Sequence, residues 1–148
     1  MYRVPITGGQ PQLLYERTMG RTIAVEGDQI YWVGSAPPWG GVSTGGVFTG
    51  PAAGGTARAL ALSNEVMGGM AVDEQYVYWT AIRSVWRVPK TGRSPEQIIS
   101  CAGTPFVMRV DSDTIYYRNW DGEVWARGKS GGEPRKLSAG NPDFTTAP

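Results

Sequence analysis

The amino-acid sequence repeats itself, and this repeat restricts the possible fold more than any other feature. Three short segments consist of an isoleucine or valine followed by two aromatic residues, and their tyrosines at positions 31, 78 and 116 are 47 and 38 residues apart. An apolar segment ending in valine precedes each of them, and the valines at positions 25, 72 and 110 have the same two spacings. Two features with matched offsets indicate a structural repeat of about 40 residues. The three aromatic segments are Ile30-Tyr31-Trp32, Val77-Tyr78-Trp79 and Ile115-Tyr116-Tyr117.

A third feature completes the repeat. An aromatic residue stands six positions before a glycine at four places, and an apolar segment of strand length follows each glycine. Each full unit therefore contains four short apolar segments, and none of them has helical periodicity. Turn signals such as Asp121-Gly122 between the segments predict hairpins, so the strands should form an antiparallel meander. The four aromatic residues are Tyr2, Phe48, Trp86 and Trp125, and their glycines are Gly8, Gly54, Gly92 and Gly131.

Four antiparallel strands in about 40 residues are the sequence signature of a β-propeller blade. In Val77-Tyr78-Trp79, large side chains point alternately to the two faces of a strand, so both faces of the sheet must be buried. Blades stacked around an axis bury both faces, whereas an isolated blade leaves them exposed together with its edges. We therefore predict an all-β fold, a β-propeller of four-stranded antiparallel blades, with about 3.5 blades in this chain.

The predicted single domain covers residues 1–148. It begins with a half-blade at 1–16, which holds the last two strands of a blade, and continues with blades at about 22–63, 69–101 and 107–140. Closed propellers have roughly four to eight blades. We therefore expect the ring to be completed either by a second copy, in a homodimer with two-fold symmetry, or by the remainder of a longer propeller.

The best copy of the repeat resembles a known family. Residues 71–73 (Ala-Val-Asp), 78–80 (Tyr-Trp-Thr) and 85–90 (Val-Trp-Arg-Val-Pro-Lys) are similar to the YWTD-type β-propellers. They are more similar still to bacterial propeller repeats with a Tyr-Trp-Thr and then a Val-x-Arg-Val-Pro pattern. The resemblance extends over nearly the whole chain. It implies the propeller fold but no single function, because such repeats have many roles.

The chain departs from the YWTD pattern at one position. In that family an aspartate ends the motif and helps to tie neighbouring blades, and the resemblance places Gly34, Ala81 and Asn119 there. Only Asn119 could supply a comparable polar link. We therefore expect the ties between blades to come from elsewhere, with Asp73 and Asp111 as candidates.

Composition argues against several classes of function. The chain has no histidine, which removes the usual general base and the usual zinc ligand, and its one cysteine, Cys101, permits no intrachain disulfide. The 14 basic and 13 acidic residues are dispersed, so we expect neither nucleic acid nor a membrane as partner. Asp111 and Asp113 lack the frame of a calcium loop and are interpreted as turn residues. We expect no metal and no cofactor.

Two tryptophans lie outside the repeated strand positions. Trp39 lies in a nine-residue insertion of the first full unit, and Trp120 lies in a turn beside Asp121. An exposed tryptophan can stack on a sugar ring or fill a pocket of a partner, although each could also fold back onto its own blade. We predict a contact surface for a protein or a glycan at Trp39, Trp120 and Asp121. The other four tryptophans, Trp32, Trp79, Trp86 and Trp125, should be core residues.

These observations favour a non-enzymatic binding or interaction module on a propeller scaffold that closes by homodimerisation. One alternative is a propeller enzyme, a lyase or hydrolase, with a carboxylate and arginine site on the central axis. Its arginines would come from the set at positions 83, 87, 109, 118 and 127. These arginines could instead be solvated at the outer edge or bind aspartates at blade junctions. Another alternative is a structural fragment of a larger propeller. The N-terminal segment 1–5 lacks an apolar signal, which leaves the compartment open.

Overall fold

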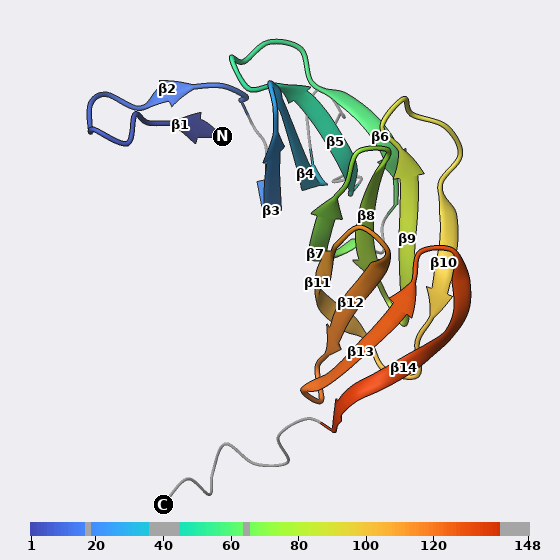
Figure 1. The fold of residues 1–148 in the computed structure, drawn as a ribbon. Coiled ribbons are helices and arrows are strands. Elements are labelled where there is room, and N and C mark those ends of the chain that lie inside the picture. Colours follow the sequence, from blue (N-terminus) through green and yellow to red (C-terminus); the bar gives the residue numbers. More distant parts are fainter. Residues whose placement is uncertain (17–18, 36–44, 64–65, 140–148) are drawn as a thin grey trace, which may run out of the picture.

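The computed structural model describes residues 1–16, 19–35, 45–63 and 66–139 and consists of β-strands joined by turns (Figure 1). No helix in this part of the chain is long and apolar enough to cross a membrane.

A two-stranded half-blade, β1 (Tyr2–Arg3) and β2 (Gln12–Leu13), comes first. Three four-stranded blades follow. Blade 1 contains β3 (Met19–Glu26), β4 (Gln29–Ser35), β5 (Gly46–Pro51) and β6 (Arg58–Leu62). Blade 2 contains β7 (Val66–Val72), β8 (Tyr76–Ala81), β9 (Ser84–Pro89) and β10 (Glu96–Ser100). Blade 3 contains β11 (Pro105–Val110), β12 (Thr114–Asn119), β13 (Glu123–Gly128) and β14 (Gly131–Ala139).

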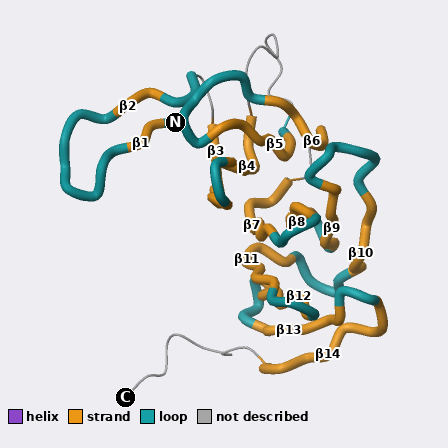
Figure 2. The backbone as a smooth tube through the Cα atoms, turned by 45° about the horizontal axis from the view of Figure 1, so that its top comes forward, coloured by secondary structure: helices purple, strands orange, loops and turns teal. Residues whose placement is uncertain are grey.

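Each blade is an antiparallel meander in which every strand pairs with the next strand along the chain. The first strands of the blades, β3, β7 and β11, lie along one side of the row of sheets, and β6 and β10 lie along the other (Figure 2). The aromatic segments occupy the second strands, where Trp79 of β8 pairs with Trp86 of β9 and Trp32 of β4 with Phe48 of β5. The observed fold, with four-stranded antiparallel blades and no helices among the described residues, confirms the all-β architecture predicted from the sequence.

The hydrophobic core lies between successive blades. On β8, Trp79 packs toward blade 1 and joins one buried cluster, whereas Tyr78 points the opposite way and joins the cluster shared with blade 3. The alternation of side chains along a strand therefore assigns each aromatic residue of the segment to a different neighbour. Trp32, at the position of Trp79, packs against Tyr15 at the end of the half-blade, with ring centroids 5.1 Å apart.

The glycine of the third repeat feature closes a tight turn between the third and fourth strands. The amide of Gly8 donates to the carbonyl of Pro5 at 2.9 Å, that of Gly54 to the carbonyl of Pro51 at 2.9 Å, and that of Gly92 to the carbonyl of Pro89 at 2.8 Å. The φ angles of these glycines are 85°, 90° and 73°. Residues with a β-carbon rarely adopt such angles, which explains the glycine six residues after Tyr2, Phe48 and Trp86.

The half-blade covers only part of blade 1. Ile23 and Val25 of β3 are 52% and 64% exposed, whereas Met70 and Met108, at the position of Ile23 in the next two blades, are 3% and 1% exposed. In blades 2 and 3 the first strand of the preceding blade covers this position. The half-blade contributes only outer strands, so Ile23 and Val25 remain exposed.

Candidate functional site

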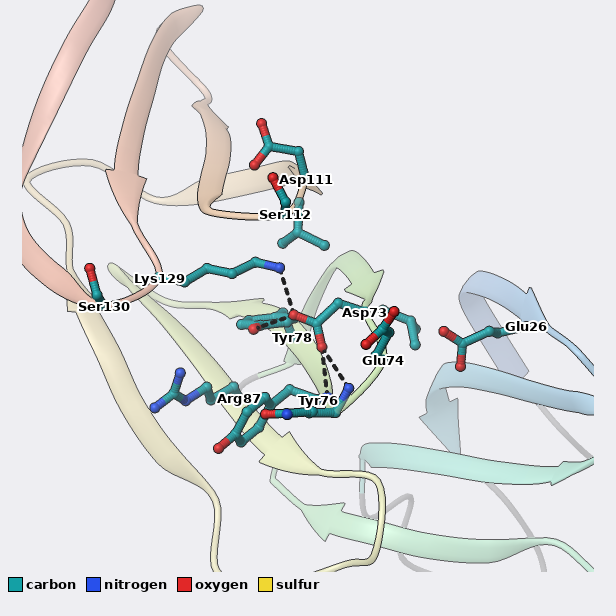
Figure 3. Close-up of a pocket in the computed structure, with 13 residues that line it drawn as sticks. Glu26, Asp73, Glu74, Tyr76, Tyr78, Arg87, Asp111, Ser112, Lys129 and Ser130 are labelled. Carbon is teal, nitrogen blue, oxygen red and sulfur yellow. Dashed lines mark hydrogen bonds and ion pairs between the residues drawn. The ribbon is translucent and has the colours of Figure 1, made fainter.

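A polar groove of about 740 Å3 lies where the first turns of the three blades and the third turn of blade 3 meet (Figure 3). We call the face that contains it the groove face. In Figure 3, Asp73 points toward Lys129, and Glu26 lies apart on blade 1. The groove is lined by Glu26, Val72, Asp73, Glu74, Gln75, Tyr76, Tyr78, Arg87, Val110, Asp111, Ser112, Lys129 and Ser130.

Asp73 holds the first turn of blade 2 in shape. One carboxylate oxygen, Oδ1, accepts from the amides of Gln75 at 3.0 Å and Tyr76 at 2.8 Å. The other, Oδ2, accepts from the hydroxyl of Tyr78 at 2.7 Å and from Nζ of Lys129 at 2.6 Å. Bonds to amides two and three residues ahead are the usual way in which aspartate stabilises a turn.

Asp111 repeats this arrangement in blade 3. Its Oδ1 accepts from the amides of Asp113 at 2.9 Å and Thr114 at 2.7 Å, and its Oδ2 accepts from the hydroxyl of Tyr116 at 3.0 Å. The interpretation of this acidic segment as a turn agrees with the geometry. Among the residues that the structure describes, no group of three or more acidic or cysteine side chains could hold a metal ion.

A lysine ties blade 2 to blade 1, and another ties blade 3 to blade 2. Lys129, in the third turn of blade 3, binds Asp73 of blade 2, and Lys90, in the third turn of blade 2, binds Glu26 of blade 1. The Lys129 and Asp73 side chains are only 15% and 20% exposed. Asp73 thus forms the kind of tie between blades that was expected of it.

Two carboxylates of the groove, Asp73 and Asp111, have lowered pKa values. Burial alone would raise the pKa of Asp73, but hydrogen bonds from Lys129, Tyr78 and two amides lower it to about 2. The amides of Asp113 and Thr114 likewise lower the pKa of Asp111. Carboxylates with low pKa values are weak general bases near neutral pH.

Arg87 brings a guanidinium to the same groove, as the enzyme alternative requires. It is engaged by Glu96 of the neighbouring strand and lies over the ring of Tyr76, 4.4 Å from its centroid. Four charged side chains of the groove are therefore each engaged in an ion pair: Glu26, Asp73, Arg87 and Lys129. This arrangement favours a structural role for these four side chains.

The opposite face of the blades carries the turns between second and third strands. Trp120 lies at the tip of the β12–β13 turn, is 64% exposed, and stacks on Phe106 of its own blade with centroids 4.5 Å apart. Asp121 follows it and is exposed. One part of the Trp120 side chain therefore contacts its own blade, and the rest of the side chain is exposed to solvent. Trp39 lies outside the described residues.

A second apolar side chain is exposed on this face. Ile82, at the tip of the β8–β9 turn, is 54% exposed. The connection between blades 2 and 3 runs between the two turns, because the amide of Cys101 donates to the carbonyl of Arg83 at 2.8 Å and that of Trp120 to the carbonyl of Thr104 at 3.3 Å. We call the surface formed by Ile82, Phe106 and Trp120 the aromatic face.

Comparisons by sequence found no matching family model and no matching curated protein. Solved structures do match. A chain in the crystal structure of a nidogen/laminin complex superposes with a TM-score of 0.70 over 91% of this chain, at 16% identity. A protein assigned as TolB from Agrobacterium tumefaciens superposes with a TM-score of 0.73 over 93% of this chain, at 18% identity. Both neighbours are β-propellers. The chain is a partial β-propeller. It spans about half the length of these structures, 52% and 55% respectively.

Some residues of the propeller junctions were not identified from sequence. Lys90 and Lys129 form the ties, and the available signal was their shared position four residues after Trp86 and Trp125. Arg127, one of the arginines considered as possible ties to aspartates at the junctions, instead donates to the carbonyl of Ile98 in blade 2. An arginine has several donors and can satisfy carbonyls as well as carboxylates.

Proposed function

We propose that this partial propeller is a non-enzymatic interaction module whose contact surface is the aromatic face. The observation that carries the proposal is the 64% exposure of Trp120 on the β12–β13 turn. Stacking on Phe106 fixes the indole ring, so little conformational entropy is lost when a partner covers it. Tryptophan is among the residues that contribute most to binding energy at interfaces.

The partner that fits this face best is a protein. Ile82 extends the exposed apolar surface beyond the aromatic pair, and Arg118 lies against Phe106, 5.5 Å from its centroid. Interfaces between proteins are rich in aromatic residues and arginine. A sugar ring would also stack on Trp120, and a glycan remains the other ligand class.

Replacement of Trp120 by alanine tests this proposal. We expect the free energy of unfolding in urea to change by less than about 1 kcal/mol, since most of the side chain is exposed. Partners captured by the immobilised wild-type chain and identified by mass spectrometry should bind the variant at least about tenfold more weakly.

The matched control is Ile6→Ala, because Ile6 is fully exposed in the half-blade, away from the aromatic face. This variant should keep the partners. Equal binding by Trp120→Ala and the wild type would place the contact surface elsewhere. Binding to a glycan array that depends on Trp120 would assign a glycan ligand instead.

We also propose that further blades complete the ring, and that a second copy can provide them in a homodimer. Support comes from uncovered apolar side chains at both ends of the row of blades. Ile23 and Val25 are exposed on blade 1, and Val107 and Leu137 are exposed on blade 3. Exposed apolar surface of this kind marks an interaction site.

Light scattering during size-exclusion chromatography tests closure by a second copy. We expect a mass that rises toward twice 16.0 kDa with concentration. Val25→Asp and Leu137→Asp should each return the mass to 16.0 kDa, because a charge on an apolar docking face is costly to bury. A wild-type chain that stays at 16.0 kDa would assign completion of the ring to a longer propeller.

We further propose that the repeat is a variant of the YWTD type. In both Tyr31-Trp32 and Tyr78-Trp79 the tryptophan packs toward the preceding blade and the tyrosine toward the following one. The tyrosine hydroxyl of blade 2 binds Asp73 in the first turn instead of an aspartate at the end of the motif.

A further inference from the structure

The two complete junctions between blades share one polar contact. In each, a carboxylate in the first turn of one blade accepts from a lysine in the third turn of the next blade. The pairs are Glu26 with Lys90 and Asp73 with Lys129. This ion pair is therefore a repeated feature of the contact between successive blades.

Blade 3 has the carboxylate of such a junction without its lysine. Asp111 is held by two turn amides and by Tyr116, as Asp73 is held by two turn amides and by Tyr78. Among the residues that the structure describes, no ion pair includes Asp111. The Asp111 carboxylate is thus held in the same way as the carboxylate of Asp73, which accepts from the lysine of the following blade.

The lysine position can be followed through the third turns of all the blades. Its amide donates to the first turn of the same blade in each case: Ala52 to Asp28 at 2.7 Å, Lys90 to Gln75 at 3.0 Å and Lys129 to Asp113 at 2.7 Å. In blades 2 and 3 this position is a lysine, and in both cases the first turn of the preceding blade has a carboxylate. Blade 1 follows the half-blade, which has only outer strands, and it carries Ala52 at this position.

The open side of blade 3, which carries Asp111, also has apolar side chains that are less buried than their counterparts in the other blades. Tyr116 is half-buried, whereas Tyr31 and Tyr78, at the same position, are buried against the following blade. Val124 is half-buried in the same way, whereas its counterpart Val85 is fully buried. With the exposed Val107 and Leu137, these residues form what we call the open face of blade 3.

We infer that the open face of blade 3 docks a further blade of this repeat whose third turn places a lysine ammonium on Asp111. The apolar residues supply most of the binding, and the ion pair sets the register between the blades. This inference rests on the proposed completion of the ring, and it states which chemistry the completing blade must bring.

The half-blade of a second copy meets this requirement only in part. Its third turn has the same bond from the amide of Gly8 to the carbonyl of Pro5, but Ile6 stands at the lysine position and is fully exposed. A second copy can therefore offer Tyr2 and Val4 as apolar contacts but no ammonium. The blade that fits Asp111 is one with lysine at this position.

The substitution Ile6→Lys turns the chain itself into a probe for this site. It gives the half-blade the missing ammonium, and Ile6 makes no buried contact that the change could disrupt. A closed pair of chains would gain one ion pair at each of two junctions. We therefore expect the dissociation constant for self-association, measured by sedimentation equilibrium, to fall about five- to twentyfold relative to the wild type.

Two double variants locate the contact. Ile6→Lys with Asp111→Asn should lose the gain, because asparagine can still accept from the turn amides but carries no charge. Ile6→Lys with Asp113→Asn should keep it. No gain from Ile6→Lys, or a gain that survives Asp111→Asn, would overturn the inference. Self-association of the wild type tests ring completion separately, so failure of the lysine contact and failure of closure give different results.

Discussion

Replacing Trp79 by alanine should lower the free energy of unfolding by about 3–5 kcal/mol. Trp79 is buried between blades 1 and 2, where it stacks on Trp86 with ring centroids 6.3 Å apart and packs with Tyr31 and Val47. Its removal leaves a cavity between two sheets that cannot close, since each sheet is held by its own ladder of hydrogen bonds. Urea unfolding followed by tyrosine and tryptophan fluorescence measures the change.

The matched control for this large loss is Trp120→Ala, which removes the same side chain from an exposed turn. The two variants should differ by about 2 kcal/mol or more, because Trp79 lies at a repeated core position and Trp120 lies in an exposed turn. Equal losses would mean that Trp120 belongs to the core or that the contact between blades 1 and 2 contributes little to stability.

Replacing Asp73 by alanine should cost about 2 kcal/mol, the second largest effect that we expect. The change removes the acceptor for two turn amides and the hydroxyl of Tyr78, and it leaves Lys129 half-buried without its partner. The loss should appear as a lower midpoint of urea unfolding. Asp113→Ala, in an exposed turn outside the ties between blades, is the control and should change stability little.

The same carboxylate predicts how stability depends on pH. Its pKa is about 2 in the folded chain and 3.8 in an unperturbed aspartate, so the unfolded chain binds the proton first as the pH falls. The stabilisation is therefore complete above about pH 4 and is lost as the pH falls through 2. Since the group is partly exposed, we expect about 1–2 kcal/mol from this titration.

Urea unfolding at pH 5, 3 and 2 would detect this dependence. The wild type should lose more stability between pH 4 and 2 than Asp73→Ala, because the variant lacks the titrating group. Parallel pH profiles for the two chains would show that the bond between Lys129 and Asp73 does not contribute to the stability of the folded chain.

The repeat allowed the fold to be predicted from sequence because blade structure is local. Alternation of Tyr78 and Trp79 on one strand requires two buried faces, and the glycine six residues after each aromatic residue requires a turn with positive φ. Asp73 was a candidate tie because it recurs at a fixed place in the repeat. These inferences depend on neighbours in sequence, which the sequence displays directly.

The partners across blade junctions could not be predicted in the same way. Lys129 and Asp73 are 56 residues apart, and many charged residues of this chain could have formed such a pair. Trp120 was singled out because it breaks the repeat, but its stacking on Phe106 depends on how β11 and the β12–β13 turn meet in space. Long-range contacts of this kind are determined by the packing of whole sheets.

The sequence by itself therefore determined the unit: four strands, their turns, and which side chains must be buried. Only the tertiary structure decided what each unit binds: which lysine reaches which carboxylate, and which apolar faces have no cover. The physical reason is that strand pattern and turn geometry are properties of a few adjacent residues, whereas burial and ion pairing require surfaces from two blades to meet.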